Sequence, residues 1–343
     1  MSGRADVAVI MANYNGARFI AAAIRSIVQQ TLASWELIIV DDASTDDSVA
    51  IAERAAGGDP RIKIVTQRAN RGASAARNRA LDLVTARWIA IVDSDDLMPP
   101  QRLESLLRRA HITGATIIAD NLLEFSSNAR PRSFLPDRLC KEVSWISLES
   151  FIRSNSLYSR TPPLGYLKPL IRADVIREFG LRYDETLRIG EDFDFLIRLM
   201  ARGYRMLLDP TSVYFYRKHD GSISHRLRAG DITALIAADD RFTRRGVSFP
   251  QPVAAALKRR RRSLQSLLAY DEIITAIKRA DFLAAARRAL GHPHIWPMLI
   301  QPIAARLRRT ALRGKRFVEF DDDSTLEALL IESSTARTSG VAS

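Results

Sequence analysis

Short apolar runs alternate with longer amphipathic runs over the first 120 residues of the chain. Near-continuous runs rich in isoleucine and valine are typical of strands that are buried on both faces. They predict four strands, at residues 7–11, 36–40, 62–65 and 88–92. Helical spacing predicts helices between and after these strands, at about residues 17–30, 46–56, 72–84 and 100–113. This alternation predicts an α/β fold with a mostly parallel, Rossmann-like sheet and helices on both faces.

Polar side chains follow the first, second and fourth of these strands. They are Asn13, Tyr14, Asn15, Asp41, Asp42, Ser44, Asp93, Ser94, Asp95 and Asp96. Open parallel sheets bind ligands beyond the carboxyl ends of their strands, so these loops are the candidate site. Helix capping accounts for about one carboxylate in each loop. It does not account for three within four residues after Val92, because clustered like charges are costly unless they share a cation.

The sequence lacks both common glycine-rich phosphate loops. No two glycines have the G-x-G spacing of a dinucleotide fingerprint, and no G-x-x-x-x-G-K-[ST] phosphate loop is present. Phosphate must then be neutralised in another way, for which a divalent cation held by carboxylates is suited. Oxygen ligands favour Mg²⁺ or Mn²⁺ bridging to substrate phosphates.

Charge is distributed unevenly along the chain. The formal net charge is +12, from 51 Lys and Arg against 39 Asp and Glu. Residues 241–320 contain 18 basic and 4 acidic residues, a balance of +14, which leaves −2 for the remainder. Three partners suit such a segment: nucleic acid, an anionic membrane surface, or water around solvated helices. We expect residues 226–343 to be mainly helical and basic, with a flexible tail after about residue 332.

Six motifs in order give the chain a family resemblance. They are VAVIMANYN, VDDASTDDS, NRGASAARNRAL, WIAIVDSDD, GEDFDFLIRLMARG and RKHDGSIS, and they span roughly residues 5–225. In this order and spacing they resemble the family 2 glycosyltransferases, which have the GT-A fold. The resemblance implies a catalytic domain over residues 1–225, with a nucleotide-sugar half at 1–120 and an acceptor half at 121–225. Within the acceptor half, we expect residues 120–170 to form loops that wall the acceptor cleft.

The resemblance also implies roles for individual residues. Tyr14 and Asp42 match positions that hold a uracil ring, and Arg71 and Arg77 match the region along the nucleotide, with Arg77 the candidate for the diphosphate. Asp93 matches a position near the ribose, and Asp95 the position that ligates the metal, Mg²⁺ or Mn²⁺. His219 matches a position near the donor phosphates and the metal, although a lone histidine is also a common structural hydrogen-bonding group. The remaining expected nucleotide-sugar contacts are Asn13, Asn15 and Ser94.

Two carboxylates, Glu191 and Asp192, begin a helical pattern. Favourable placement of acidic groups at a helix N-terminus is the structural explanation for such a pair. The family resemblance instead implies that this motif supplies the catalytic base. We expect Asp192 to be the base and Glu191 to orient it or the acceptor. A single base opposite a leaving diphosphate implies inversion of the anomeric centre.

The resemblance implies transfer of a hexose, expected to be glucose, from a UDP-sugar donor to a lipid-linked oligosaccharide on polyprenyl diphosphate. Within the family, the chain length and the motif sequences resemble those of bacterial exopolysaccharide glucosyltransferases of the succinoglycan type. Two alternatives remain at this point, namely a sugar nucleotidyltransferase and a non-enzymatic basic membrane adaptor. The absence of a glycine-rich N-terminal loop argues against the first, and the retained D-S-D and E-D motifs argue against the second.

The expected location is the cytoplasm, at the periphery of the inner face of the cytoplasmic membrane. Residues 295–305, the longest apolar candidate, are too few for a transmembrane helix, and residues 7–11 are too short for a signal core. A single cysteine, Cys140, excludes an internal disulfide. Basic residues around Trp296 favour an anionic membrane surface over nucleic acid as the partner of the C-terminal region.

Overall fold

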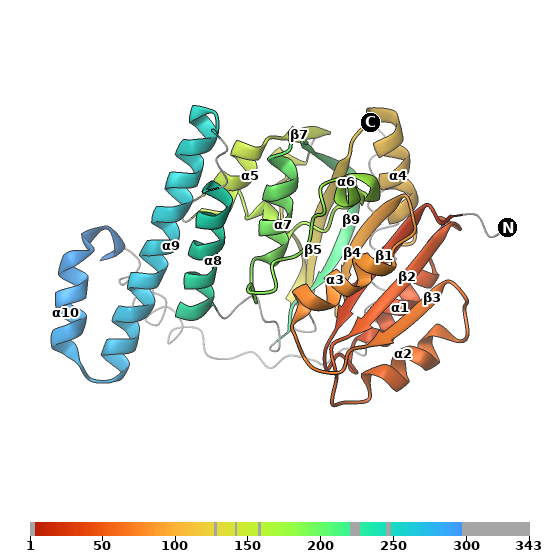
Figure 1. Cartoon of the computed structure of the whole chain (residues 1–343), viewed down its shortest axis with the longest axis horizontal. Coiled ribbons are helices and arrows are strands. Elements are labelled where there is room, and N and C mark those ends of the chain that lie inside the picture. The colour runs from red at the N-terminus through yellow and green to blue at the C-terminus, as the bar shows by residue number, and fades with distance from the viewer. Residues whose placement is uncertain are drawn as a thin grey trace. The chain divides into compact units, whose positions relative to one another are not determined.

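The computed structural model describes residues 4–126, 129–140, 143–156, 159–219, 227–244 and 248–296. These residues belong to two compact units, which are described separately. The first unit contains the described residues of 4–148 and 164–219, and the second contains those of 149–163 and 227–296 (Figure 1). The predicted flexible tail after residue 332 lies outside the described residues.

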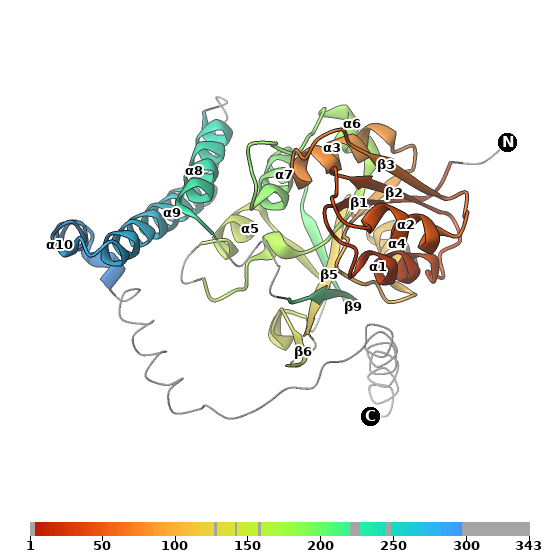
Figure 2. The same cartoon turned by 90° about the horizontal axis from the view of Figure 1, so that it is seen from below.

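The first unit begins with the alternating pattern that the sequence predicts. In order, its elements are β1 (Val7–Asn13), α1 (Ile20–Val28), β2 (Trp35–Asp41), α2 (Ser48–Ala56), β3 (Ile62–Thr66), α3 (Ala73–Leu83), β4 (Trp88–Asp93) and α4 (Arg102–Thr113). Strands β1 to β4 pair in parallel. Helices α1, α2 and α4 lie on one side of this sheet and α3 on the other (Figure 2). All four predicted strands and all four predicted helices are confirmed.

The second half of this unit turns the parallel sheet into a mixed one. Its elements are β5 (Ile117–Ser126), β6 (Ala129–Ser133), β7 (Ser144–Ile146), β8 (Leu170–Arg172), α6 (Ala173–Glu178), α7 (Glu191–Met200) and β9 (Met206–Arg217), with short 3-10 turns at Asp137–Leu139 and Leu164–Tyr166. The strand order is β3-β2-β1-β4-β8-β5-β9-β7, with β6 paired to β5. Strand β8 runs antiparallel to both β4 and β5.

The expectation of loops throughout residues 120–170 is wrong in part, because β5 continues to Ser126 and β6 to β8 follow. Polar residues inside β5 interrupt the apolar pattern by which a buried strand is predicted. Asp120 is buried and accepts hydrogen bonds from Arg102 of α4, at 2.8 and 2.7 Å. Asn121 accepts a hydrogen bond from the backbone N–H of Leu135 at 2.9 Å. A polar residue can lie inside a buried strand when its partners satisfy it.

The second unit is helical in its described part. It contains α5 (Leu148–Ser154), α8 (Ala229–Thr243), α9 (Gln251–Lys278), α10 (Phe282–Gly291) and a 3-10 turn at Pro293–Ile295. Buried Arg260 of α9 donates to Asp239 of α8 at 3.0 Å and to the Asn155 carbonyl at 3.0 Å. No helix among the described residues is long and apolar enough to cross a membrane.

Strand register brings the polar loops of the first unit together. Ala12 lies beside Asp93 across the β1–β4 pair, and Asn13 lies beside Asp41 across the β1–β2 pair. The buried apolar residues of β1, β2 and β4 fix these strands side by side. The loops that follow their carboxyl ends therefore meet at one edge of the sheet, where the sequence places the candidate site.

Candidate active site

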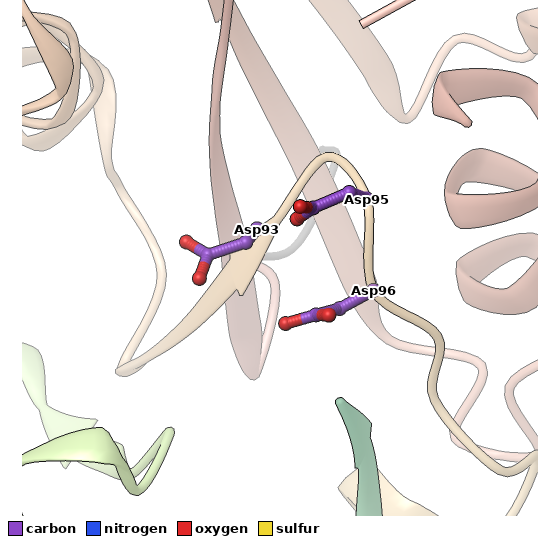
Figure 3. Close-up of side chains that lie close together, drawn as sticks. All are labelled: Asp93, Asp95 and Asp96. Carbon is purple, nitrogen blue, oxygen red and sulfur yellow. The ribbon is translucent and has the colours of Figure 1, made fainter. Parts of the chain in front are cut away.

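Three aspartates lie at the end of β4 and in the turn that follows it. Oxygens of Asp93, Asp95 and Asp96 lie within 4.8 Å of one another, an arrangement that could hold a metal ion. Figure 3 shows the three carboxylates on the same side of the turn. Their environments differ, because Asp96 is fully buried, whereas the side chains of Asp93 and Asp95 are 26% and 33% accessible.

Asp95 and His219 fit the expected divalent cation. His219 Nε2 lies 2.9 Å from Asp95 Oδ2, and the ring of Phe19 packs at 4.7 Å from the histidine ring. Adjacent ligands of an octahedral ion with bonds near 2.1 Å are separated by about 3 Å. The donor atoms of Asp95 and His219 therefore have the spacing of two neighbouring ligands, as the sequence assignment requires, and substrate phosphate and water would supply the others.

Asp96 has a structural role in the same turn. Its carboxylate is fully buried and accepts hydrogen bonds from Tyr214 Oη and the Arg217 backbone N–H, each at 2.8 Å. Burial, with the nearby charges of Asp95 and Asp93, holds the pKa of the Asp96 carboxyl well above its ordinary value. Asp96 thus ties the turn to β9, which also places His219 beside Asp95.

The loop after β2 is held by buried carboxylates. Asp42 is 2% exposed and accepts hydrogen bonds from the backbone N–H groups of Arg71 and Gly72, at 2.8 and 2.6 Å. Asn13 is also buried, and its amide donates to Asp41 Oδ1 at 2.8 Å. These two expected nucleotide contacts therefore shape the loops between the strands and α3.

The other expected nucleotide residues are more accessible. Tyr14 is 49% exposed, as a ring available for stacking would be. Asn15 has φ of 51° and accepts a hydrogen bond from the Thr45 backbone N–H at 2.8 Å. Arg71 forms an exposed ion pair with Glu185 at 2.7 Å. Ser94 lies between Asp93 and Asp95 and is half-buried.

A cluster of five charged side chains joins the two halves of the first unit. Arg77 lies 2.7 Å from Asp93 and 2.7 Å from Glu191. Lys168 Nζ lies 2.7 Å from Asp93 Oδ2 and 2.8 Å from Asp192 Oδ2. Two cations thus face three carboxylates. The structure places Arg77 among these carboxylates, a position that the expected diphosphate role did not indicate.

Burial and mutual charge set the protonation of this cluster. Burial opposes the charge of Lys168, yet Asp192 and Asp93 hold the pKa of Lys168 well above its ordinary value. Burial also opposes ionisation of Asp93, but Lys168 and Arg77 hold the pKa of Asp93 far below its usual range. Burial raises the pKa of Glu191, an effect that Arg77 only partly offsets. The cations therefore keep Asp93 ionised, whereas Glu191 takes up a proton more readily than an ordinary glutamate.

Glu191 and Asp192 begin α7, as the helical pattern predicts, and Gly190 precedes them with φ of 81°. A left-handed residue before the helix lets the chain turn sharply into it, and glycine adopts that conformation without steric cost. The carboxylates at this helix end thus face the end of β4. Below them, the ring of Tyr183 stacks on Phe195 at 4.4 Å, with the Arg77 guanidinium 5.4 Å from the Tyr183 ring centre.

Sequence reasoning missed Lys168. Its signal was a lone cation in the apolar run GYLKPLI, where Leu167 and Leu170 are both buried. A lysine amid buried residues requires a charged partner, and here it has two.

The Glycosyl transferase family 2 model matches residues 8–178. The chain is 36% identical to the Rhizobium meliloti succinoglycan biosynthesis protein ExoO over 308 residues, which cover 90% of this chain and 88% of ExoO. It is 33% identical to ExoU of the same organism, over 88% of this chain and 87% of ExoU. A shorter match, 41% identical over 99 residues, links 29% of this chain to 38% of the Escherichia coli UDP-Glc:alpha-D-GlcNAc-diphosphoundecaprenol beta-1,3-glucosyltransferase WfgD.

Among solved structures, the chain is similar to the mannosyltransferase PcManGT from Pyrobaculum calidifontis in complex with GDP-Man and Mn²⁺. The TM-score is 0.59 at 19% identity, over 97% of this chain and 87% of that one. At this identity the likeness shows the GT-A fold that the motif series implies, and nothing finer.

Proposed function

Because the chain belongs to glycosyltransferase family 2, we propose that it is an inverting, metal-dependent hexosyltransferase of exopolysaccharide biosynthesis. It transfers glucose from UDP-glucose to a saccharide carried on polyprenyl diphosphate. The similarity to two succinoglycan biosynthesis proteins supports the pathway class, and the match to WfgD supports the donor and the lipid carrier. Membership in this family argues against the two alternatives, a sugar nucleotidyltransferase and a non-enzymatic membrane adaptor.

The observation that carries the proposal is the shared contact of Asp93 and Asp192 with Lys168, at 2.7 and 2.8 Å. It joins the end of β4, where the donor binds, to the helix that supplies the base. For an acceptor hydroxyl to attack the anomeric carbon, the donor sugar and the general base must lie close together. Asp95 lies in the turn that follows Asp93, and His219 lies beside it, with Nε2 2.9 Å from Asp95 Oδ2.

Asp192 acts as the general base. Its Oδ2 contacts Lys168, while its buried Oδ1 has no hydrogen-bond partner among the described residues. The acceptor hydroxyl donates its proton to this oxygen as the hydroxyl oxygen attacks the anomeric carbon. The bond from that carbon to the diphosphate breaks, and UDP leaves with the bonding electron pair. An α-linked donor therefore gives a β-glycoside without a covalent sugar–enzyme intermediate.

Asp95 and His219 would hold Mg²⁺ or Mn²⁺, which when bound supplies positive charge to the departing diphosphate. Tyr14 supports the uracil ring by stacking. Asp42 holds in place the loop that contacts this ring. Asp93 lies near the ribose, held by Arg77 and Lys168. Arg71, Asn13, Asn15 and Ser94 complete the donor side.

A donor and acceptor screen tests this function. The purified protein is incubated with MnCl₂, a panel of UDP-sugars and a membrane fraction that contains polyprenyl-diphosphate saccharides, and released UDP is measured. We expect UDP release that depends on the membrane fraction and is fastest with UDP-glucose. Formation of a nucleotide sugar from UTP and a sugar phosphate, without such release, would contradict the proposal.

We also propose that the second unit contacts the anionic cytoplasmic membrane surface, the surface that carries a polyprenyl-diphosphate acceptor. Three apolar side chains on one face of α10 support this, because Phe282, Leu283 and Leu290 are 67%, 83% and 71% exposed. Exposed Arg287 lies beside them, and Trp296 is half exposed nearby in the chain. An amphipathic basic helix with exposed apolar residues suits the boundary between lipid headgroups and acyl chains. Nucleic acid, in contrast, offers no counterpart to the apolar face.

A further inference from the structure

We propose that Lys168 is a positioning residue for the reaction, which holds Asp192 at a fixed place relative to the end of β4. The inference rests on the proposed function, in which Asp192 is the base. Lys168 itself touches no reacting atom. Its effect is exerted through Asp192.

The contacts of Lys168 support this assignment directly. Its ammonium group bridges Asp93 Oδ2 and Asp192 Oδ2 at 2.7 and 2.8 Å, and the residue is 5% exposed. Charge-assisted hydrogen bonds of this length are strong and directional. Since Asp93 ends a central strand and Asp192 begins α7, one buried side chain fixes the distance between the two elements.

The backbone of Lys168 is also held in place. Its carbonyl accepts a hydrogen bond from Arg102 Nη2 at 2.6 Å. The guanidinium of Arg102 is fully buried and is itself bound to Asp120 at 2.8 and 2.7 Å. The backbone of Lys168 is thus anchored. A side chain can position another residue only if its own backbone is held in place, and Lys168 meets this condition.

Lys168 also determines which oxygen of Asp192 can act. It occupies Oδ2, whereas Arg77 Nη1 lies 3.6 Å from Oδ1, beyond hydrogen-bond distance. Oδ1 has no hydrogen-bond partner among the described side chains and backbone groups. The base can therefore take a proton at Oδ1 while Lys168 holds the other oxygen.

Asp93 depends less on Lys168 than Asp192 does. Asp93 Oδ1 is also bound by Arg77 Nη2 at 2.7 Å, a contact that does not involve Lys168. No second cation lies within hydrogen-bond distance of Asp192 among the described residues. Loss of Lys168 should therefore impair the base and leave donor binding nearly intact.

A double-mutant cycle tests the inference by initial rates of UDP release, with UDP-glucose, MnCl₂ and the membrane fraction. The variants are Lys168→Met, Asp192→Asn and their combination, with Lys168→Arg to restore the charge. Arg109→Met is the matched control, because it removes a cation from an ion pair with buried Asp209 elsewhere in the same unit. Binding of UDP with Mn²⁺ confirms that each variant is folded, and Lys168→Gln replaces the methionine variant if that protein does not fold.

We expect Lys168→Met to lower kcat by about 10²-fold, within the range of general-base contributions. The donor KM should change little, Lys168→Arg should recover most of the rate, and Arg109→Met should leave kcat unchanged. In the Asp192→Asn background, Lys168→Met should cause no further loss, because Lys168 acts through Asp192. Wild-type kcat in Lys168→Met, or losses that multiply in the double variant, would overturn the inference. A wild-type protein that turns over no UDP-sugar would instead contradict the proposed function, and the inference with it.

Discussion

Asp192 and Glu191 are neighbours in sequence but differ in what their oxygens contact. Glu191 is bound by Arg77 at 2.7 Å and has a pKa raised by burial. Asp192 is bound through one oxygen only, at 2.8 Å from Lys168. This difference supports the proposed assignment of Asp192 as the base, and we expect Glu191 to hold Arg77 in place.

Replacement of Asp192 by asparagine should therefore slow the chemical step and leave the affinity for UDP nearly unchanged. We expect kcat for Asp192→Asn to fall by about 10²- to 10⁴-fold, since the amide cannot accept the proton. Glu191→Gln is the matched control and should lose less, because an amide can still accept from Arg77. Initial-rate kinetics and calorimetry of UDP binding measure the two effects, and equal losses in both variants would contradict the assignment.

Asp95 should determine how donor binding depends on metal. In the wild type, we expect UDP to bind more tightly with Mn²⁺ than with EDTA, because a cation held by Asp95 would supply positive charge to the diphosphate. In Asp95→Ala, the two affinities should become equal. Calorimetric titration with UDP in both conditions measures this, and an unchanged Mn²⁺ effect in the variant would remove Asp95 from the metal site.

The sequence motifs were sufficient to predict the residues of the D-S-D turn and the pair at the start of α7, because each motif is contiguous. Lys168 was missed, since its partners Asp93 and Asp192 are distant in sequence. The β4–β8 pairing brings Lys168 near Asp93, and α7 supplies Asp192. The carboxylate partners of Arg77 were missed for the same reason. Contacts between distant segments depend on strand order, which a local pattern does not contain.

At the scale of elements, the loop after β1 is closely packed. A Cβ atom added at Gly16 would lie 2.2 Å from Asn13 Oδ1. Asn13 is buried, and its amide donates to Asp41 at 2.8 Å. The loop that carries Tyr14 therefore depends on a residue without a side chain at position 16.

Gly16→Ala should displace Asn13 and weaken both the fold and the donor site. We expect the free energy of unfolding to fall by about 1–3 kcal/mol, as for other overpacked sites. Urea denaturation measures this loss, and UDP affinity should fall in parallel. Gly230→Ala is the matched control, since nothing lies within 4 Å of its added Cβ, and its stability should not fall. Equal stability of the two variants would show that the loop tolerates the methyl group.

The pairing of α4 with β5 rests on a fully buried ion pair. Arg102→Met would remove the arginine partner of buried Asp120, and removal of one member of a buried pair costs about 3–5 kcal/mol. The change should also release the carbonyl of Lys168. Chemical denaturation of Arg102→Met measures the loss, and a loss below 1 kcal/mol would contradict the structural role of the pair.

Element prediction was reliable where burial is uniform. Strands β1, β2 and β4 are near-continuous apolar runs of mostly buried residues, so their positions were predictable from sequence. Strand β3 was also predicted, although its residues are half-buried or exposed. Strand β5 was not predicted, because Asp120 and Asn121 interrupt its apolar pattern and have their hydrogen-bond partners on other segments.

At the scale of the whole molecule, the excess positive charge lies in residues 241–320, outside the motif-bearing segment. The net charge of the chain therefore does not describe the chemistry of the site, and the proposed membrane contact lies in a different segment. Each basic group near an anionic lipid surface contributes about 1 kcal/mol to binding.

A Phe282→Ser, Leu283→Ser variant tests the membrane proposal. In flotation with vesicles of anionic and neutral phospholipid, we expect the wild type to bind the anionic vesicles and to be released by high salt. The double variant should bind several-fold less, because apolar contact adds to the electrostatic attraction. Equal flotation of variant and wild type, or no wild-type binding, would exclude α10 as the lipid contact.

The stereochemistry of transfer tests the central claim most directly. The wild-type protein is incubated with UDP-glucose, MnCl₂ and the lipid-linked acceptor fraction, and the new linkage is read by NMR from the anomeric coupling of the transferred sugar. A single general base at Asp192 opposite the leaving diphosphate predicts a β-linked product from the α-linked donor. An α-linked product, or transfer that persists at the wild-type rate in Asp192→Asn, would contradict the account.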